Sequence, residues 1–166
     1  MKIFLKLKHW QVFLIWTLTG IISAVTSLSQ YWIVTFIIYE ITFIGWIYSI
    51  GKVTNEMNKT CKIENYKEDL WFIFLLIFFL PFGYFSHVTK PTNGFLMFGA
   101  VVLEGISIVK LTNFSAKAVS QLERNKCLGF RDYLSEFLLI LLLPLGIWII
   151  QPRMNKIIKA YSANKL

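Results

Sequence analysis

Two glutamates inside long apolar runs are the residues best placed for chemistry. Glu40 lies at the centre of residues 31–50, YWIVTFIIYEITFIGWIYSI, and Glu104 lies in the shorter run 95–109. About twenty apolar residues cross a bilayer as a helix, and a carboxylate at that depth is costly without a partner, a proton or water. The two glutamates are therefore candidate proton- or cation-binding groups. The hydroxyl side chains in the same runs that would complete such a site are those of Thr35, Thr42 and Ser107.

The same glutamates also have a purely structural interpretation. A carboxyl group that is protonated, or that accepts a hydrogen bond from a neighbouring hydroxyl, can stay in an apolar helix and serve only its packing. One sequence does not separate this interpretation from the functional one, so both are carried forward.

The composition is that of a membrane protein. Of the 166 residues, 56% are hydrophobic and only 16% are charged, whereas a soluble domain has about 25% charged residues. The apolar residues come in long blocks rather than at amphipathic spacing, which excludes an ordinary globular core. We therefore expect one all-α membrane domain over residues 1–166, a polytopic transmembrane helical bundle with about five crossings.

The apolar blocks define the expected helices. These cover residues 10–28, 31–50 with an extension to 60, 70–88, 95–109 with an amphipathic extension to 126, and 133–150, followed by a basic tail at 151–166. Pro81 and Pro144 fall inside the third and fifth helices, where a proline removes a backbone hydrogen bond and kinks the axis. Gly20, Ala24 and Ser27 recur along one side of the first helix. Such small residues let helices pack closely in lipid, or alternatively line a polar pore.

Two similar halves indicate an internal repeat. Residues 74–83, FLLIFFLPFG, match residues 137–146, FLLILLLPLG, at seven of ten positions. Upstream, Glu40 pairs with Glu104 at an offset of 64, and the two cysteines are 66 residues apart. We therefore expect a tandem two-helix repeat, related by an axis along the membrane normal, that places both glutamates at matching depth.

The basic residues predict an orientation, with one inconsistency. With five crossings, the side of the N-terminus carries twelve Lys and Arg residues and the other side carries five. The positive-inside rule then puts the N-terminus in the cytoplasm of a multi-pass cell-membrane protein. The Phe-, Ile-, Lys- and Asn-rich composition suggests a bacterial inner membrane. The basic tail would be exported against the rule, unless one segment, of which 95–109 is the shortest, fails to span.

The net charge of +8 favours lipid or protein partners. Nucleic acid is excluded, because no basic motif with a recognition fold is present. Cations beside apolar runs contact the head groups of the lipid bilayer, or a membrane protein partner. The residues expected to form this partner or lipid surface are Lys117, Arg124, Arg153 and Lys156.

Motifs for catalysis or metal binding are missing. Two cysteines, Cys61 and Cys127, and two histidines are too few and too scattered for a zinc site. We interpret the cysteines as unreactive thiols in polar connections. The chain has no GxSxG, HExxH, P-loop or GxGxxG pattern, so we expect neither an enzyme nor a metal or cofactor site.

Two functional hypotheses follow from these features. The first is an ion- or proton-conducting or transporting protein that uses the intramembrane glutamates. The alternative is a non-catalytic membrane subunit, sensor or effector that acts through protein partners in a larger assembly. Small polytopic chains of either kind often form homo-oligomers.

Overall fold

The structure, a computed structural model, describes residues 7–25, 32–58, 61, 63, 70 and 94–163. Every regular element in these residues is helical, which confirms the all-α expectation for this part of the chain. The elements are α2 (His9–Val25), α3 (Trp32–Met57), α5 (Gly94–Arg124), the 3-10 helix η1 (Phe130–Tyr133), α6 (Leu134–Leu141) and α7 (Leu143–Ala163). Apart from Leu70, the expected third helix with Pro81 lies outside the described residues, so the expected tandem repeat is not tested.

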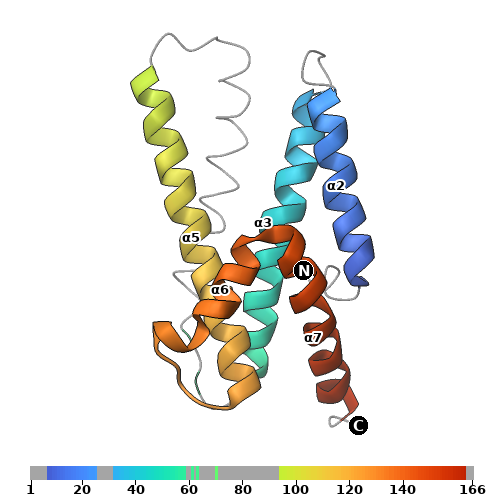
Figure 1. Ribbon diagram of the computed structural model, residues 1–166, viewed down its shortest axis with the longest axis vertical. Helices are drawn as coiled ribbons and strands as arrows, with labels where there is room; N and C mark the ends of the chain where they lie inside the picture. The colour runs from blue at the N-terminus through green and yellow to red at the C-terminus, as the bar shows by residue number, and fades with distance from the viewer. Residues whose placement is uncertain are drawn as a thin grey trace.

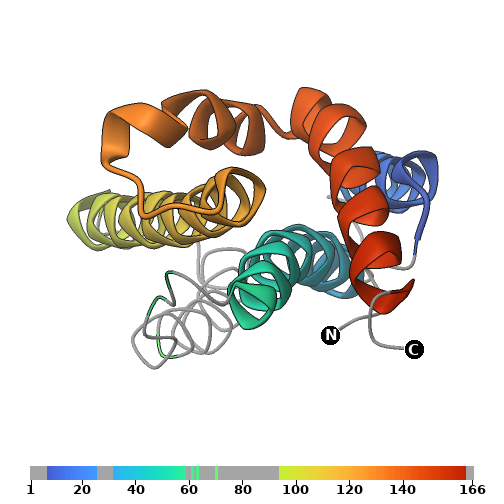
Figure 2. The ribbon, with the colours of Figure 1, turned by 90° about the horizontal axis from the view of Figure 1, so that it is seen from below.

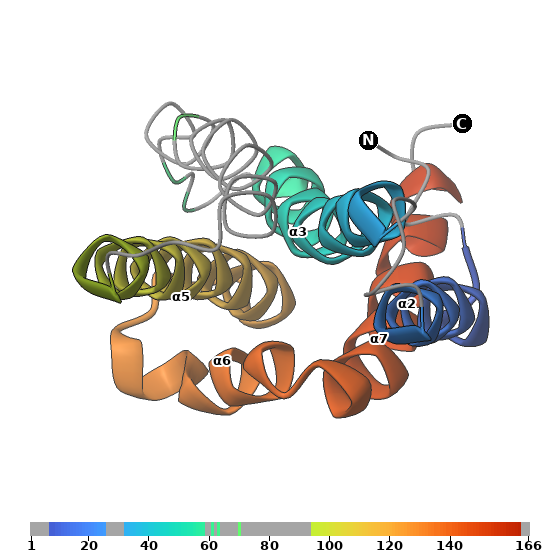
Figure 3. The same ribbon diagram turned by 90° about the horizontal axis from the view of Figure 1, so that it is seen from above.

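The helices α2 and α3 run antiparallel, whereas α3 and α5 run parallel and meet near their C-terminal ends (Figure 1). At this junction the Ser115 hydroxyl donates a hydrogen bond of 2.8 Å to the carbonyl oxygen of Ile47. A methyl group built on Gly51 would lie 2.5 Å from the Ser115 oxygen and 2.6 Å from the Phe114 ring. The glycine therefore permits the close approach. From this junction the two helices diverge toward their N-terminal ends, as the view from above also shows (Figure 3).

The tightly packed core lies at the polar end of the molecule. Residues of the C-terminal half of α5, such as Leu111, Ala116 and Val119, are fully buried, because α3 covers one side of this helix and α6 another (Figure 2). The extension to residue 126 was expected at a lipid or partner surface, and the structure instead places its middle in the core. Other helices of the same chain cover the apolar side of this extension.

The opposite end of the molecule, formed by the C-terminal half of α2 and the N-terminal halves of α3 and α5, shows the reverse distribution. Large apolar side chains are exposed there, including Leu18 of α2, Val34 of α3 and Phe98 of α5, the last at 68%. A soluble protein rarely exposes apolar surface of this extent. A hydrocarbon environment removes the cost of that exposure.

A disulfide joins the chain beyond α3 to the chain beyond α5. Cys61 and Cys127 form this bond with their Cα atoms 5.5 Å apart, at a sequence separation of 66. The sequence predicted two separate, unreactive thiols, and this prediction is wrong. The two expected repeat partners meet because α3 and α5 end side by side.

The last apolar segment is broken rather than continuous. The expected helix 133–150 is two helices, and the axes of the apolar stretches Phe130–Leu141 and Leu145–Tyr161 differ by 115°. The break lies at Leu142, whose ψ of 65° is not helical. Pro144 follows in the first turn of α7, where its missing N–H is tolerated. Residues 151–163 of the expected tail continue α7, which contains Pro152.

By length and composition, one described helix is clearly apolar enough to cross a bilayer, namely residues Phe36–Met57 of α3. The bent pair of α6 and α7 passes the same test only if it is counted as one span, and the apolar stretch of α2, Trp10–Ile22, is shorter. These observations are a weak indication of a membrane location. The number of crossings belongs to the proposals below.

We expect Gly51→Ala to loosen the junction of α3 and α5. The added methyl group would overlap Ser115 and Phe114, and overpacking of this kind lowers the free energy of unfolding by about 1–3 kcal/mol. Gly99→Ala is the matched control, because nothing lies within 4 Å of a methyl group there and alanine favours a helix by up to about 1 kcal/mol. Thermal unfolding followed by circular dichroism in detergent measures both. A Gly51→Ala protein as stable as the control would contradict the proposed close contact.

Candidate functional site

Glu40 lies on the side of α3 that faces α5. It is only 7% exposed. Eleven residues, close to three full turns of an α-helix, separate it from Gly51, so the two residues share one side of α3. Gly51 contacts α5 directly. The carboxyl group is therefore on the junction side of the helix, above the close contact.

The position of Glu104 on α5 mirrors that of Glu40. Glu104 also precedes the junction by eleven residues, counted to Ser115, and is therefore on the same side of α5 as this serine. At about 1.5 Å per residue both positions are about 16 Å from the junction. The two helices diverge over this distance (Figure 1), so both glutamate positions lie where α3 and α5 have separated.

Of the three hydroxyl groups expected around the glutamates, two are buried and donate hydrogen bonds to carbonyl oxygens of their own helices. Ser107 is buried and donates a hydrogen bond of 2.8 Å to the carbonyl oxygen of Leu103 in its own helix. Thr42 is also buried and donates to the carbonyl oxygen of Ile38 at 2.7 Å. Two residues after Glu40, Thr42 is about 200° around the helix and so on the opposite side. Of Thr35 only the helical backbone is described.

The helix α2 packs beside Glu40 through one of the expected small residues. A methyl group on Gly20 would lie 3.2 Å from the Tyr39 ring, and the rings of Trp16 and Tyr39 stack with centroids 5.6 Å apart. Gly20 thus lies in the α2–α3 contact against Tyr39, the residue before Glu40. Ala24 is exposed, and Ser27 lies outside the described residues.

A polar cluster that the sequence analysis missed ties α3, α7 and the start of the chain together. The Trp46 indole nitrogen donates a hydrogen bond of 2.8 Å to the Gln151 side-chain oxygen. The Gln151 side-chain nitrogen donates to the carbonyl oxygen of Leu7 at 3.1 Å, and Asn155 donates to the same oxygen at 3.4 Å. The only signal in the sequence is an isolated amide, Gln151, at the end of an apolar run.

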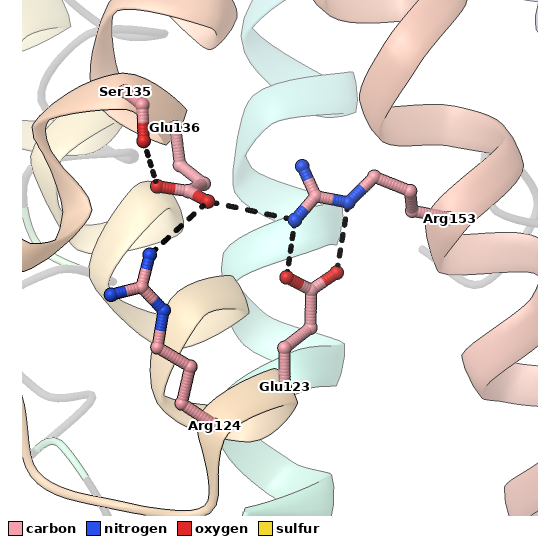
Figure 4. A network of polar contacts seen from close by, with 5 residues as sticks. All are labelled: Glu123, Arg124, Ser135, Glu136 and Arg153. Atoms are coloured by element: carbon pink, nitrogen blue, oxygen red, sulfur yellow. Dashed lines mark hydrogen bonds and ion pairs between the residues drawn. The ribbon is translucent and has the colours of Figure 1, made fainter.

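A second missed cluster pairs the arginines that were assigned to a partner or lipid surface. The Arg153 guanidinium donates to Glu123 through Nε at 3.0 Å and through Nη2 (Figure 4). The same Nη2 lies 3.5 Å from a Glu136 oxygen, and Arg124 approaches Glu136 at 3.9 Å.

In this cluster Glu136 is the buried member. Its side chain is 7% exposed, and its second oxygen accepts a 2.7 Å hydrogen bond from Ser135. The two arginines and two glutamates balance in charge, so the network serves folding and leaves Arg124 and Arg153 engaged within the chain. Lys117 is half-buried on α5, and Lys156 is exposed on α7.

Among the residues that the structure describes, no group of three or more His, Cys, Asp or Glu could hold a metal ion. No known protein family, curated protein or solved structure matches this chain. The candidate site therefore rests on its own geometry.

We expect Glu136→Gln to lower the free energy of unfolding by about 1–3 kcal/mol, because it leaves two guanidinium groups without the charge that they share. The loss of stability stays below that for a fully buried ion pair. The side chains of Arg124 and Arg153 are 41% and 35% exposed, so water screens their charges. Glu56→Gln, at an exposed position of α3, should change stability by less than about 0.5 kcal/mol. Equilibrium unfolding in detergent compares them, and equal stability of the two variants would contradict a folding role for the network.

Proposed function

We propose that this protein is a multi-pass membrane protein that moves protons or a small cation across the bilayer, with Glu40 and Glu104 as the exchanging groups. The observation that carries the proposal is their placement. Both positions precede the Gly51–Ser115 contact by eleven residues, so each lies on the same side of its helix as the residue that makes this contact.

The distribution of exposed side chains supports the membrane part of this proposal. Apolar residues cover the outer sides of α2, α3 and α5 over the length that includes Glu40 and Glu104. The charged and amide groups gather at the opposite end, around Glu136 and Gln151. This is the arrangement of a bundle whose end opposite the junction lies in hydrocarbon and whose junction end meets water.

The chemistry of a buried carboxyl group explains why it would exchange ions. In hydrocarbon a bare carboxylate is costly, so a group at the depth of Glu40 is stabilised by a partner group, by a proton or by a bound cation. Releasing that ion on one side and taking up another on the other side requires water to reach the group in turn. Carboxyl groups at one depth on two helices would offer an ion oxygen ligands at that depth, as cation pathways commonly do.

The alternative, a non-catalytic subunit that acts through membrane protein partners or through copies of itself, has one supporting observation. An apolar strip on α5 is exposed at Phe98, Val102, Ile106 and Val109. A transmembrane partner could cover this strip as well as lipid does. The pairing of Arg124 and Arg153 inside the chain removes two of the cations that such a partner was expected to meet.

Flux through purified protein in liposomes tests the proposal. With a potential set across the membrane, we expect wild-type protein to pass protons or a monovalent cation, and Glu40→Gln and Glu104→Gln each to lower the rate by about tenfold or more. Glu56→Gln, which changes an exposed carboxyl on the same helix as Glu40, should leave the rate unchanged. Wild-type rates in Glu40→Gln would refute the assigned site. An absence of wild-type flux, with a partner recovered in mild detergent, would favour the alternative.

A further inference from the structure

The broken segment α6–α7 begins and ends at the same end of the molecule. Near the start of α6, Glu136 lies 3.5 Å from Arg153 in the second half of α7 and 3.9 Å from Arg124, the last residue of α5. Two residues before Arg153, Gln151 bonds to Leu7, which precedes α2. Both arms of the α6–α7 hairpin therefore lie in the half of the molecule that holds the C-terminal ends of α3 and α5 and the start of α2 (Figure 1).

The hairpin is too short to reach the opposite side of a bilayer. Gln151 is level with the start of α2, and α7 begins eight residues before it, at Leu143. At about 1.5 Å per residue the first turn of α7 lies at most about 12 Å beyond Gln151. The hydrocarbon core is about 30 Å thick. The tip of the hairpin thus reaches less than half of that depth.

The tip itself is apolar and uncovered. Leu142 and Leu145 are 54% and 56% exposed, with Leu141 beside them. The two arms approach closely here, because a side chain on Gly146 would overlap the carbonyl oxygen of Leu139. Farther down, the Trp148 ring lies 5.8 Å from that of Phe13, so α7 packs along α2. Exposed lysines, Lys156 and Lys159, follow on the same helix below the apolar part.

We propose that α6 and α7 form a re-entrant hairpin whose leucine tip lies among the acyl chains of one leaflet and whose lysines meet its anionic head groups. This inference rests on the membrane location in the proposed function but not on transport. The occupant of the exposed tip is lipid, because the apolar tip and the basic rim match the two layers of a leaflet in depth and in charge.

The hairpin removes the inconsistency in the distribution of cations. If the last segment re-enters, the four Lys and Arg residues of the tail join the twelve on the side of the N-terminus, and of the 17 in the chain only Lys90 is left on the other side. Four crossings then satisfy the positive-inside rule with both termini in the cytoplasm. The segment 95–109 need not fail to span, since it belongs to the continuous 31-residue helix α5, about 46 Å long.

Reporters fused to the two ends of the full chain test the topology. Green fluorescent protein at the C-terminus should fluoresce in the cytoplasm, as it should at the N-terminus, and alkaline phosphatase at the C-terminus should be inactive. Termini on opposite sides would overturn the hairpin. Termini that share the external side would support it, and would also place the Cys61–Cys127 bond in an oxidising compartment. None of these readings depends on flux, so they stay valid if the transport proposal fails.

A nitroxide label at the tip identifies what covers it. The native cysteines are joined in the disulfide, so Leu145→Cys supplies one reactive thiol and Lys156→Cys supplies the control. In vesicles with phosphatidylglycerol, we expect oxygen dissolved in lipid to relax the label at position 145 more than a water-soluble nickel chelate does, and the reverse at position 156. Relaxation by nickel at position 145, or spin–spin broadening between labels of two copies there, would overturn the assignment to lipid.

Discussion

The contact of Gly51 with Phe114 and Ser115 is the constraint on which the other features of the structure depend. It fixes α3 and α5 as a parallel pair, sets how far each helix extends beyond the junction, and places their ends close enough for the disulfide. Because each glutamate precedes the junction by eleven residues, this one contact also brings two ionisable positions to one depth. Rotating one helix by 100° about its axis at the junction would turn its glutamate position away from the junction side.

The polar groups at the junction end hold the remaining helices to this pair. Gln151 joins α7 to Trp46 of α3 and to the chain before α2, while Arg153 joins α7 to the end of α5 through Glu123. These directed bonds leave the apolar side chains at the opposite end of the molecule facing outward, because the bundle is held together at one end. The disulfide and the cations at that end favour different compartments. Disulfides persist in an oxidising compartment, whereas Lys and Arg residues beside membrane spans favour the cytoplasmic side.

The predictions that the structure confirms are those in which a local sequence pattern is compatible with only one structure. Apolar blocks placed α2, α3 and α5 to within a few residues. Predictions were wrong where the same local composition is compatible with two different structures. The stripe of Leu111, Phe114 and Val119 suits a lipid surface as well as another helix, and a neighbouring helix covers it in the fold. Likewise Pro144 and Gly146 are compatible with a kink or with a hairpin. Backbone dihedrals at Leu142 and contacts with Arg124 and Arg153 give the hairpin.

The sequence by itself determined that this chain is helical, that its apolar runs suit a bilayer and that two carboxyls stand inside those runs, because these follow from composition and from the length of each run. Only the tertiary structure decided that the carboxyl of Glu40 is buried, which arginines pair with Glu123 and Glu136, and that Cys61 meets Cys127. These partners are 12 to 66 residues apart in the sequence, and no local periodicity encodes a meeting at that range. Packing in three dimensions supplies it.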